Sequence, residues 1–193
     1  MKLQKTVFLT ILLVTGAVQA QHINLGIKGG LNLVNINNSN NSAYDARVGF
    51  HAGLLGHIHL TRQFALQPEI TYSLQGADYT VAGLKTKVKL SYINIPVLVQ
   101  YMFDNGFRIS AGPQLGFLVD ARSESRIAKV NIKSSLNSVD FALGAGIGYV
   151  HPPSGIGIDA RYNLGLSNMN KNGPARSYNR VFQLGVFYLF KHR

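Results

Sequence analysis

The sequence contains no cysteine, and this absence excludes several kinds of structure and chemistry. A chain without cysteine has no disulfide bonds, no thiolate nucleophile and no cysteine-ligated metal. Charge is also scarce, because only 14% of the 193 residues are charged whereas 46% are hydrophobic. That balance is typical of short strands with one apolar face rather than of a highly solvated globule.

Long apolar runs are absent except at the N-terminus. There, Lys2 and Lys5 precede the apolar residues 7–14, and residues 18–20 form a small-residue cleavage box. This arrangement is typical of a secretory signal peptide, and the run is shorter than the roughly 20 residues of a membrane-spanning helix. We therefore predict a cleaved signal peptide at residues 1–20.

The mature chain, residues 21–193, is long enough for one domain of ordinary size, and it is basic. Its formal net charge falls from +11 to +9 when Lys2 and Lys5 are removed. Gln21 follows the cleavage box in place of the cysteine that a lipoprotein anchor requires. Export argues against nucleic acid as a partner and favours anionic lipopolysaccharide or lipid headgroups. Simple solvation of the surface accounts for the same charge, because no block of five like charges occurs.

Apolar and polar residues alternate with a period of two along the mature chain, as in β-strands with one apolar face. No helical period of 3.6 residues is sustained. The alternation divides the chain into eight segments at residues 23–33, 47–60, 63–75, 87–102, 107–120, 139–149, 156–167 and 182–190. Short turns at residues 60–63, 104–106 and 151–155 separate longer connections at residues 34–46, 76–86, 121–138 and 168–179. Short turns at one rim and long loops at the other are the pattern of outer-membrane barrels, whose turns face the periplasm.

The fourth segment contains a change of phase. Val88, Leu90 and Tyr92 fit one register, whereas Ile95 and the apolar residues after it fit the other. One extra residue in a strand turns every later side chain to the opposite face. We therefore predict a β-bulge at residues 93–96.

Aromatic residues near the ends of the outward faces predict two membrane girdles. The predicted girdles contain Tyr92, Phe117 and Phe141 at the outer end, and Phe107, Tyr149 and Tyr188 at the periplasmic end. A soluble lipid-binding barrel would instead turn its apolar face inward.

The last strand ends in a distinctive order of residues. Gln183 is followed two positions later by Gly185, and the aromatic residues Tyr188 and Phe190 occupy alternate positions at its end. The pattern resembles the C-terminal signal by which bacterial outer-membrane β-barrels are recognised and inserted. We predict that these four residues form an insertion signal for the barrel-assembly machinery.

Residues 66–73, 92–98 and 158–166 resemble the Bacteroidetes-type outer-membrane β-barrel family, often labelled porin-like or PorT-like. The chain has Asn94 where the family pattern has a glutamate. The resemblance implies a barrel in the bacterial outer membrane. Together with the eight segments, it predicts an all-β fold, an eight-stranded antiparallel up-and-down transmembrane β-barrel. PorT members take part in protein secretion to the surface, a role that shared barrel motifs alone do not transfer.

Four charged residues are expected to meet inside the barrel. Lys28, Glu69, Asp159 and Arg161 have inward parity and similar heights above the periplasmic turns. The lumen of an eight-stranded barrel is just wide enough for side chains to fill it, and buried charges require partners. We predict a salt-bridged plug, and the alternative is a path for protons or solutes.

Two further patterns have a simpler explanation than the functional one. His51, His57 and His59 share an inward face with a spacing that suits a metal, but the sequence supplies no second histidine cluster. Hydrogen-bonding histidines in the lumen are therefore favoured. The glycines of residues 144–148 superficially resemble a nucleotide loop, but no helix follows them, so small residues that make room for large neighbours are favoured.

No enzymatic activity is expected. A catalytic site at the outer rim would combine a histidine with Ser, Asp or Glu, and the outer loops contain no histidine. No catalytic residue, cofactor or metal is predicted. The expected function is that of a monomeric structural or surface-interaction barrel with a filled lumen, whose partners are outer-membrane lipid, lipopolysaccharide and possible surface or secretion proteins. The alternatives are a narrow porin-like channel and an accessory barrel of a secretion system.

Overall fold

The computed structural model describes residues 23–38, 45–81, 84–125, 128–171 and 176–190. The predicted signal peptide lies outside the described residues. Eight long strands and one short strand follow one another along the chain: β1 (Ile23–Asn38), β2 (Asp45–His59), β3 (Phe64–Val81), β4 (Leu84–Met102), β5 (Phe107–Glu124), β6 (Lys129–Asn131), β7 (Val139–Val150), β8 (Ile156–Gly165) and β9 (Ser177–Leu189). A short 3₁₀ turn, η2 (Lys133–Ser135), precedes β7.

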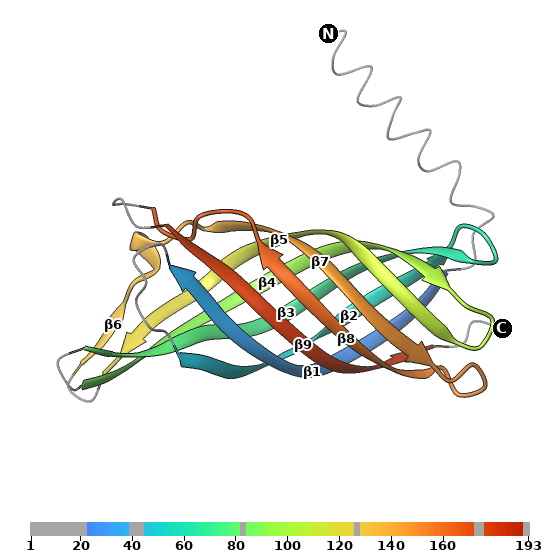
Figure 1. The fold of residues 1–193 in the computed structure, drawn as a ribbon, viewed down its shortest axis with the longest axis horizontal. Helices are drawn as coiled ribbons and strands as arrows, with labels where there is room; N and C mark the ends of the chain where they lie inside the picture. The colour runs from blue at the N-terminus through green and yellow to red at the C-terminus, as the bar shows by residue number, and fades with distance from the viewer. Residues whose placement is uncertain (1–22, 39–44, 82–83, 126–127, 172–175, 191–193) are drawn as a thin grey trace, which may run out of the picture.

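The eight long strands form a closed antiparallel barrel (Figure 1). Each strand pairs with its neighbour along the chain, and the first and last strands pair from Gly26↔Leu189 to Asn38↔Ser177. The short β6 pairs only with the end of β5 and does not belong to the ring. Closure leaves no free edge, so the backbone groups of the ring bond between strands. The predicted eight-stranded up-and-down barrel is confirmed.

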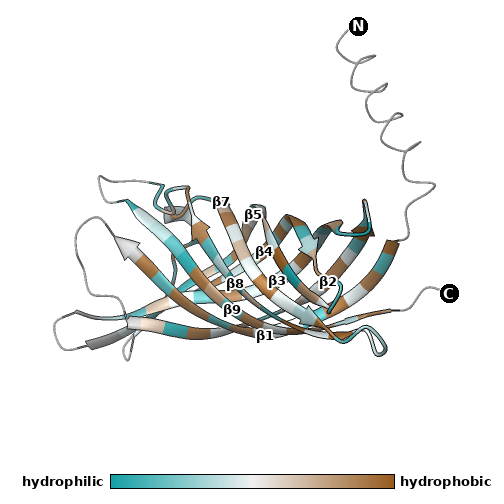
Figure 2. Ribbon diagram, turned by 45° about the vertical axis from the view of Figure 1, so that its right-hand side comes forward, coloured by the Kyte–Doolittle hydropathy of each residue, from teal (hydrophilic) through white to brown (hydrophobic). Residues whose placement is uncertain are grey.

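Alternate side chains point out of and into the barrel. Apolar side chains such as Leu25, Val48 and Ile158 are 58%, 64% and 59% exposed, whereas their neighbours in sequence turn inward. Bands of hydrophobic and hydrophilic residues alternate along the strands accordingly (Figure 2). An outward apolar surface with a polar interior is the arrangement that a bilayer requires.

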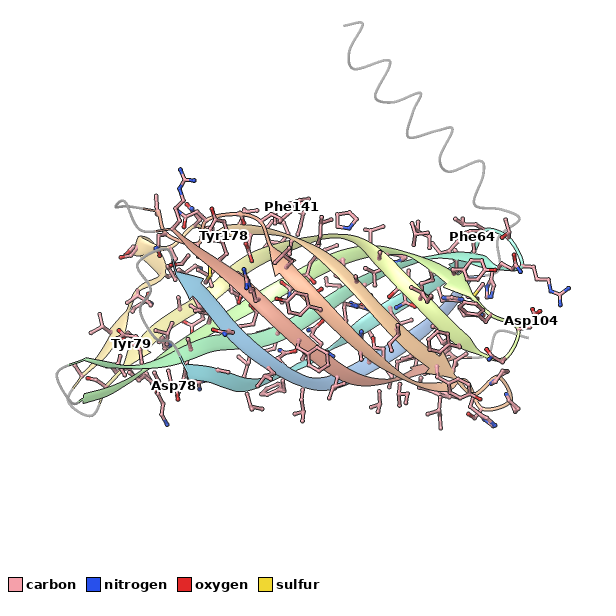
Figure 3. All side chains as sticks on the ribbon, in the orientation of Figure 1. Phe64, Asp78, Tyr79, Asp104, Phe141 and Tyr178 are labelled. Atoms are coloured by element: carbon pink, nitrogen blue, oxygen red, sulfur yellow. The ribbon has the colours of Figure 1, made fainter. Side chains whose placement is uncertain are left out.

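The two ends of the barrel differ. Asp104 and Phe64 lie at one end, where the turns are short, and Asp78 and Tyr79 lie at the other (Figure 3). We call these the short-turn end and the long-loop end. A membrane-spanning strand needs about 9–11 residues, whereas β5 has 18, so the strands extend past the bilayer at the long-loop end. Gly106 adopts a φ of +90° in its turn, which favours glycine.

The prediction of a β-bulge at residues 93–96 of the fourth segment is wrong. From Thr86 to Met102 the even-numbered side chains of β4 point inward, and Leu90 and Tyr92 are 1% and 2% exposed. The extra residue is in β5 instead, because Ser91 pairs with Asp120 and the next residue of β4 pairs with Leu118. Apolar residues therefore face inward at this end of the barrel, which an assumption of uniformly outward apolar faces could not predict.

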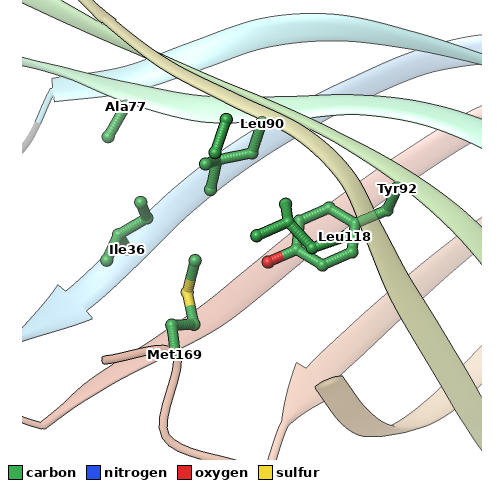
Figure 4. Packing of buried hydrophobic residues seen from close by; sticks show 7 residues of the cluster. Ile36, Ala77, Leu90, Tyr92, Leu118 and Met169 are labelled. Atoms are coloured by element: carbon green, nitrogen blue, oxygen red, sulfur yellow. The ribbon is translucent and has the colours of Figure 1, made fainter. Parts of the chain in front are cut away.

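The inward apolar residues form a core at the long-loop end (Figure 4). We call this cluster the apolar cap, and it contains Ile36, Ala77, Leu90, Tyr92, Leu118, Ala121 and Met169. Met169 belongs to the β8–β9 loop. Its carbonyl oxygen accepts a hydrogen bond at 2.8 Å from the backbone N–H of Asn137, which lies in the connection between β6 and β7. The strand ends and the β8–β9 loop thus pack apolar side chains inside the barrel at this end.

The aromatic girdles follow the prediction in part. The assignment of Tyr92 to the outer girdle is wrong, because Tyr92 lies in the apolar cap. Phe107 is half-buried. The other four predicted rings are exposed and point outward: Phe117, Phe141, Tyr149 and Tyr188. The short-turn end also has an aromatic chain that the sequence analysis missed, in which the rings of Phe64 and Tyr101 lie 5.3 Å apart and those of Tyr101 and Phe103 lie 4.9 Å apart.

Candidate functional site

The barrel interior contains a cluster of four charged side chains, which we call the charge cluster. Lys28 comes from β1, Glu69 from β3, and Asp159 and Arg161 from β8. The Arg161 guanidinium donates two hydrogen bonds to Glu69, from Nη1 to Oε2 at 3.0 Å and from Nη2 to Oε1 at 2.7 Å. The Lys28 Nζ lies 2.8 Å from Asp159 Oδ2 and 3.4 Å from Glu69 Oε2. The structure therefore brings together all four residues of the predicted network.

Burial explains why these charges must pair. The Glu69 side chain is fully buried, and those of Lys28 and Arg161 are 2% and 4% exposed. Gln67 adds a hydrogen bond from Nε2 to Glu69 Oε1 at 2.7 Å. Two cations and two anions make the cluster neutral, and removal of any one would leave an uncompensated buried charge.

Glycines of β7 make room for neighbouring side chains that point into the barrel, Asn163 and Arg108 among them. A Cβ at Gly144 would lie 2.7 Å from the side-chain oxygen of Asn163, and one at Gly148 would lie 3.3 Å from Cγ of Arg108. Both glycines point inward. Their position agrees with the structural explanation of the glycine stripe, and no helix follows β7 to form a nucleotide loop.

A second polar network is centred on Asn32, which the sequence analysis missed. Asn32 Oδ1 accepts a hydrogen bond from Gln183 Nε2 at 2.9 Å and lies 2.8 Å from His51 Nδ1. Asn32 Nδ2 donates to Ser73 Oγ at 3.0 Å. Because an amide oxygen only accepts, His51 carries its proton on Nδ1 in this arrangement. Asn32 lies four residues after Lys28 on the same strand and therefore shares its inward parity. This parity is the signal from which the sequence could have predicted the second network.

At the short-turn end the lumen opens into a cavity of about 410 Å³. We call this cavity the vestibule, and its walls include His57, His59, Phe103, Phe107, Arg108 and Leu189. The rings of His57 and His59 lie 4.6 Å apart at 90°, whereas His51 belongs to the Asn32 network. Within the described residues, no group of three or more His, Asp or Glu side chains is placed to hold a metal ion.

The sequence matches the model of the outer membrane protein beta-barrel domain family over residues 19–171. The chain belongs to this family. A comparison with curated proteins finds no match. No helix in the described part of the chain is long and apolar enough to cross a membrane.

Solved structures of other outer-membrane barrels share the fold. The chain is similar to Ail of Yersinia pestis, with 16% identity over 86% of this chain and 98% of that one and a TM-score of 0.54. It is also similar to Neisserial surface protein A, with 14% identity over 86% and 97% and a TM-score of 0.56. OprG of Pseudomonas aeruginosa has 12% identity over 88% and 96%, with a TM-score of 0.50. The protein is thus a small outer-membrane β-barrel, and identities this low establish the fold alone.

The closing strand of this outer-membrane barrel has the predicted alternation. Tyr188 and Phe190 point outward with ring centroids 5.4 Å apart, whereas Gln183 points inward to Asn163 and Asn32. A Cβ at Gly185 would lie 2.4 Å from the Asp159 carboxylate. The glycine therefore makes room for the charge cluster, and its role in an insertion signal stays a prediction.

The long-loop end is basic. Its described basic residues are Arg47, Lys87, Lys89, Arg122, Lys129, Lys133, Lys171, Arg176 and Arg180, and its acidic residues with described side chains are Asp78, Asp120, Glu124 and Asp140. Glu124 pairs with Lys89 at 2.5 Å and with Lys129 at 3.0 Å. Hydrogen bonds from these two ammonium groups lower the pKa of the Glu124 carboxyl to about 2. Asp78 and Asp120 also pair with cations, Arg47 and Arg122, whereas Asp140 accepts a hydrogen bond from Ser167. With nine basic and four acidic residues described, this end remains positive.

Proposed function

We propose that this protein is a non-enzymatic surface-interaction barrel whose basic long-loop end binds polyanions, with lipopolysaccharide or another anionic polysaccharide as the class of partner. The lumen is filled by the neutral charge cluster and covered by the apolar cap, and this closed interior is the observation that carries the proposal. A barrel that passes no solute acts through its exposed ends and its lipid-facing wall. In outer-membrane barrels the long loops face outside.

The charge distribution favours an anionic partner. Lys87, Lys171 and Arg180 are exposed, and none of them makes a salt bridge to a described carboxylate. Unpaired surface cations attract polyanions through a long-range field that salt screens over about 10 Å. The same end contains the described parts of the β5–β7 and β8–β9 loops, which would present a binding surface.

The other expected functions receive less support. Aqueous channels of the porin kind need about 16 strands, and the four residues of the charge cluster pair with one another instead of lining a water path. An accessory role in secretion, as in PorT members, rests only on the three resembling stretches. We propose that the protein is a monomer and that the barrel-assembly machinery inserts it into the outer membrane.

Binding of sucrose octasulfate to the folded mature barrel in uncharged detergent tests the proposal. Ail of Yersinia pestis has been solved in complex with this heparin analogue, which makes the compound a convenient probe. The triple variant K87Q/K171Q/R180Q should bind at least about tenfold more weakly, and higher salt should weaken binding to the unmodified protein. The matched control R62Q removes one exposed cation at the short-turn end and should bind as the unmodified protein does. Equal binding by the triple variant would refute the proposal.

A further inference from the structure

The vestibule has the size and lining of a small-molecule site, at the opposite end from the basic loops. Its volume of about 410 Å³ falls within the range of about 300–1,000 Å³ for ligand pockets. Apolar side chains form much of the wall, including Phe103, Phe107 and Leu189. Arg108 and the histidines of β2 provide the inward polar groups.

Arg108 is a buried cation without an acidic partner. It is 6% exposed, and among the described residues no carboxylate oxygen lies within 4.0 Å of its guanidinium. Its one side-chain hydrogen bond runs from Nη1 to Gln100 Oε1 at 3.4 Å, which is long, and its Nε has no partner. The ring of Phe187 lies 5.6 Å from the guanidinium carbon. These contacts replace little of the water that the guanidinium loses on burial.

Within the described residues, no carboxylate of the charge cluster forms an ion pair with Arg108, although Asp159 is near enough to attract it. Glu69 and Asp159 already balance Lys28 and Arg161, so Arg108 is a fifth buried charge in the lumen. A buried charge without a partner costs several kcal/mol. An anion bound in the vestibule would compensate it.

Two histidines add unmatched polar atoms to the same wall. His57 is 1% exposed, and the Nδ1 atoms of both His57 and His59 have no hydrogen-bond partner. The acidic side chain on the wall, Asp104, is 77% exposed and pairs with the exposed Arg62 at 3.5 Å. The buried part of the vestibule therefore presents a cation and hydrogen-bonding nitrogens, with apolar surface around them.

We propose that the vestibule binds an amphipathic phosphate ester, with the phosphate on Arg108 and the apolar part against Phe103, Phe107 and Leu189. The histidines of β2 contribute hydrogen bonds to the phosphate oxygens. The short-turn end faces the periplasm in outer-membrane barrels, so the ester comes from one of two sources. One is a soluble organic phosphate, and the other is the headgroup of a phospholipid in the inner leaflet.

Titration with phenyl phosphate tests the site in the folded mature protein, held in uncharged detergent and observed by backbone amide NMR. Saturable shifts should appear at Arg108 and His57, and benzyl alcohol, a neutral analogue, should not produce them. R108Q should weaken binding by at least about tenfold, the scale of a hydrogen bond to a charged group. The matched control R62Q makes the same charge change at the exposed edge of the vestibule wall, where Arg62 is 86% exposed and already pairs with Asp104. Because such an exposed, paired cation contributes little, R62Q should change affinity less than about twofold. Equal binding by R108Q, an equal loss in R62Q, or shifts confined to the long-loop end would overturn the proposal.

Thermal unfolding without the probe gives an independent readout. R108Q should be as stable as the unmodified protein or more stable, because it removes an uncompensated buried charge. Phenyl phosphate should stabilise the unmodified protein and R108K, which keeps the cation, but not R108Q. A marked loss of stability in R108Q without the probe would mean that the barrel itself compensates Arg108, and would contradict the proposal.

Nanodiscs distinguish the two sources. Both phosphatidylcholine and phosphatidylglycerol present a headgroup phosphate, whereas the uncharged detergent has none. If the headgroup is the ligand, both nanodiscs should shift the vestibule signals relative to detergent without any added probe and weaken phenyl phosphate binding by competition. If the ligand is soluble, phenyl phosphate should bind as well in both nanodiscs as in detergent. Absence of phenyl phosphate binding from both nanodiscs and from detergent would overturn the proposal for either source.

Discussion

Arg161 and Glu69 lie on directly opposite sides of the ring of eight strands, on β8 and β3, and join across the lumen through two hydrogen bonds of 2.7 and 3.0 Å. Each side chain reaches from its own strand to the barrel interior. Lys28, from β1, holds the same carboxylate at 3.4 Å. These contacts tie the two halves of the barrel together and occupy the space through which a solute would pass.

Removal of Arg161 should destabilise the barrel strongly. R161M leaves Glu69 and Asp159 with Lys28 as their only cationic partner among the described residues, and breaking a buried pair costs about 3–5 kcal/mol in the free energy of unfolding. Urea unfolding in lipid vesicles measures this change. R122A breaks an exposed pair with Asp120 and should cost less than about 1 kcal/mol. A loss in R161M no larger than that in R122A would show that the cluster contributes little to stability.

The double variant E69M/R161M tests the reason for that loss. Replacing both partners by apolar side chains removes the unpaired carboxylate, so part of the stability lost in R161M should return. If the double variant is less stable than R161M by the full cost of a second independent mutation, the two residues are not coupled.

Assembly should depend on the aromatic end of β9. Replacing Tyr188 and Phe190 by Ser removes two outward rings in contact with each other, and the fraction of folded, heat-modifiable barrel in outer membranes should fall. Y149S removes an exposed ring from β7 at the same end and serves as the control. Normal folded mobility of the double variant would show that the closing strand is not an insertion signal.

The orientation of the barrel predicts which residues can be labelled in intact cells. Lys171 lies in a loop at the long-loop end and Asn105 in a short turn, and both are exposed. When each is changed to Cys in this cysteine-free chain, a membrane-impermeant maleimide should label K171C and not N105C. Labelling of N105C alone would mean that the barrel has the opposite orientation.

Acid should release the contacts of Glu124 only at very low pH. Its pKa is about 2 in the folded protein against an ordinary 4.5, so its contribution to the β5–β6 hairpin is fully present above pH 4.5 and is lost as the pH falls through 2. The amide shifts of Lys129 should follow that titration, and E124Q should abolish it. A midpoint near 4.5 in the unmodified protein would show that the two lysines do not stabilise the carboxylate.

Much of the fold could be predicted from alternation alone. Inward and outward faces follow from a period of two, and this parity was sufficient to select Lys28, Glu69, Asp159 and Arg161. The signal fails where both faces are apolar. At the long-loop end the lumen has its own apolar core, so Leu90 and Tyr92 face inward, and their hydrophobicity suggested the wrong face.

Other features depend on distances that the sequence does not contain. The alternation of the fifth segment places Arg108 inward, but only the structure shows that no described carboxylate lies within 4.0 Å of it. The short strand β6 folds back on the end of β5 just before it in sequence. Met169, in contrast, joins the apolar cap with residues of β1, β3, β4 and β5 that lie far from it in sequence. Their residues have no periodicity that would have indicated these contacts.

The central claim, that the filled lumen leaves the protein to act through its surfaces, is tested most directly by planar-bilayer recording of the unmodified mature protein. The account predicts no stable conductance above that of the bare membrane, because the charge cluster and the apolar cap occupy the lumen. Large, stable, voltage-independent conductance would contradict it and establish the barrel as a pore.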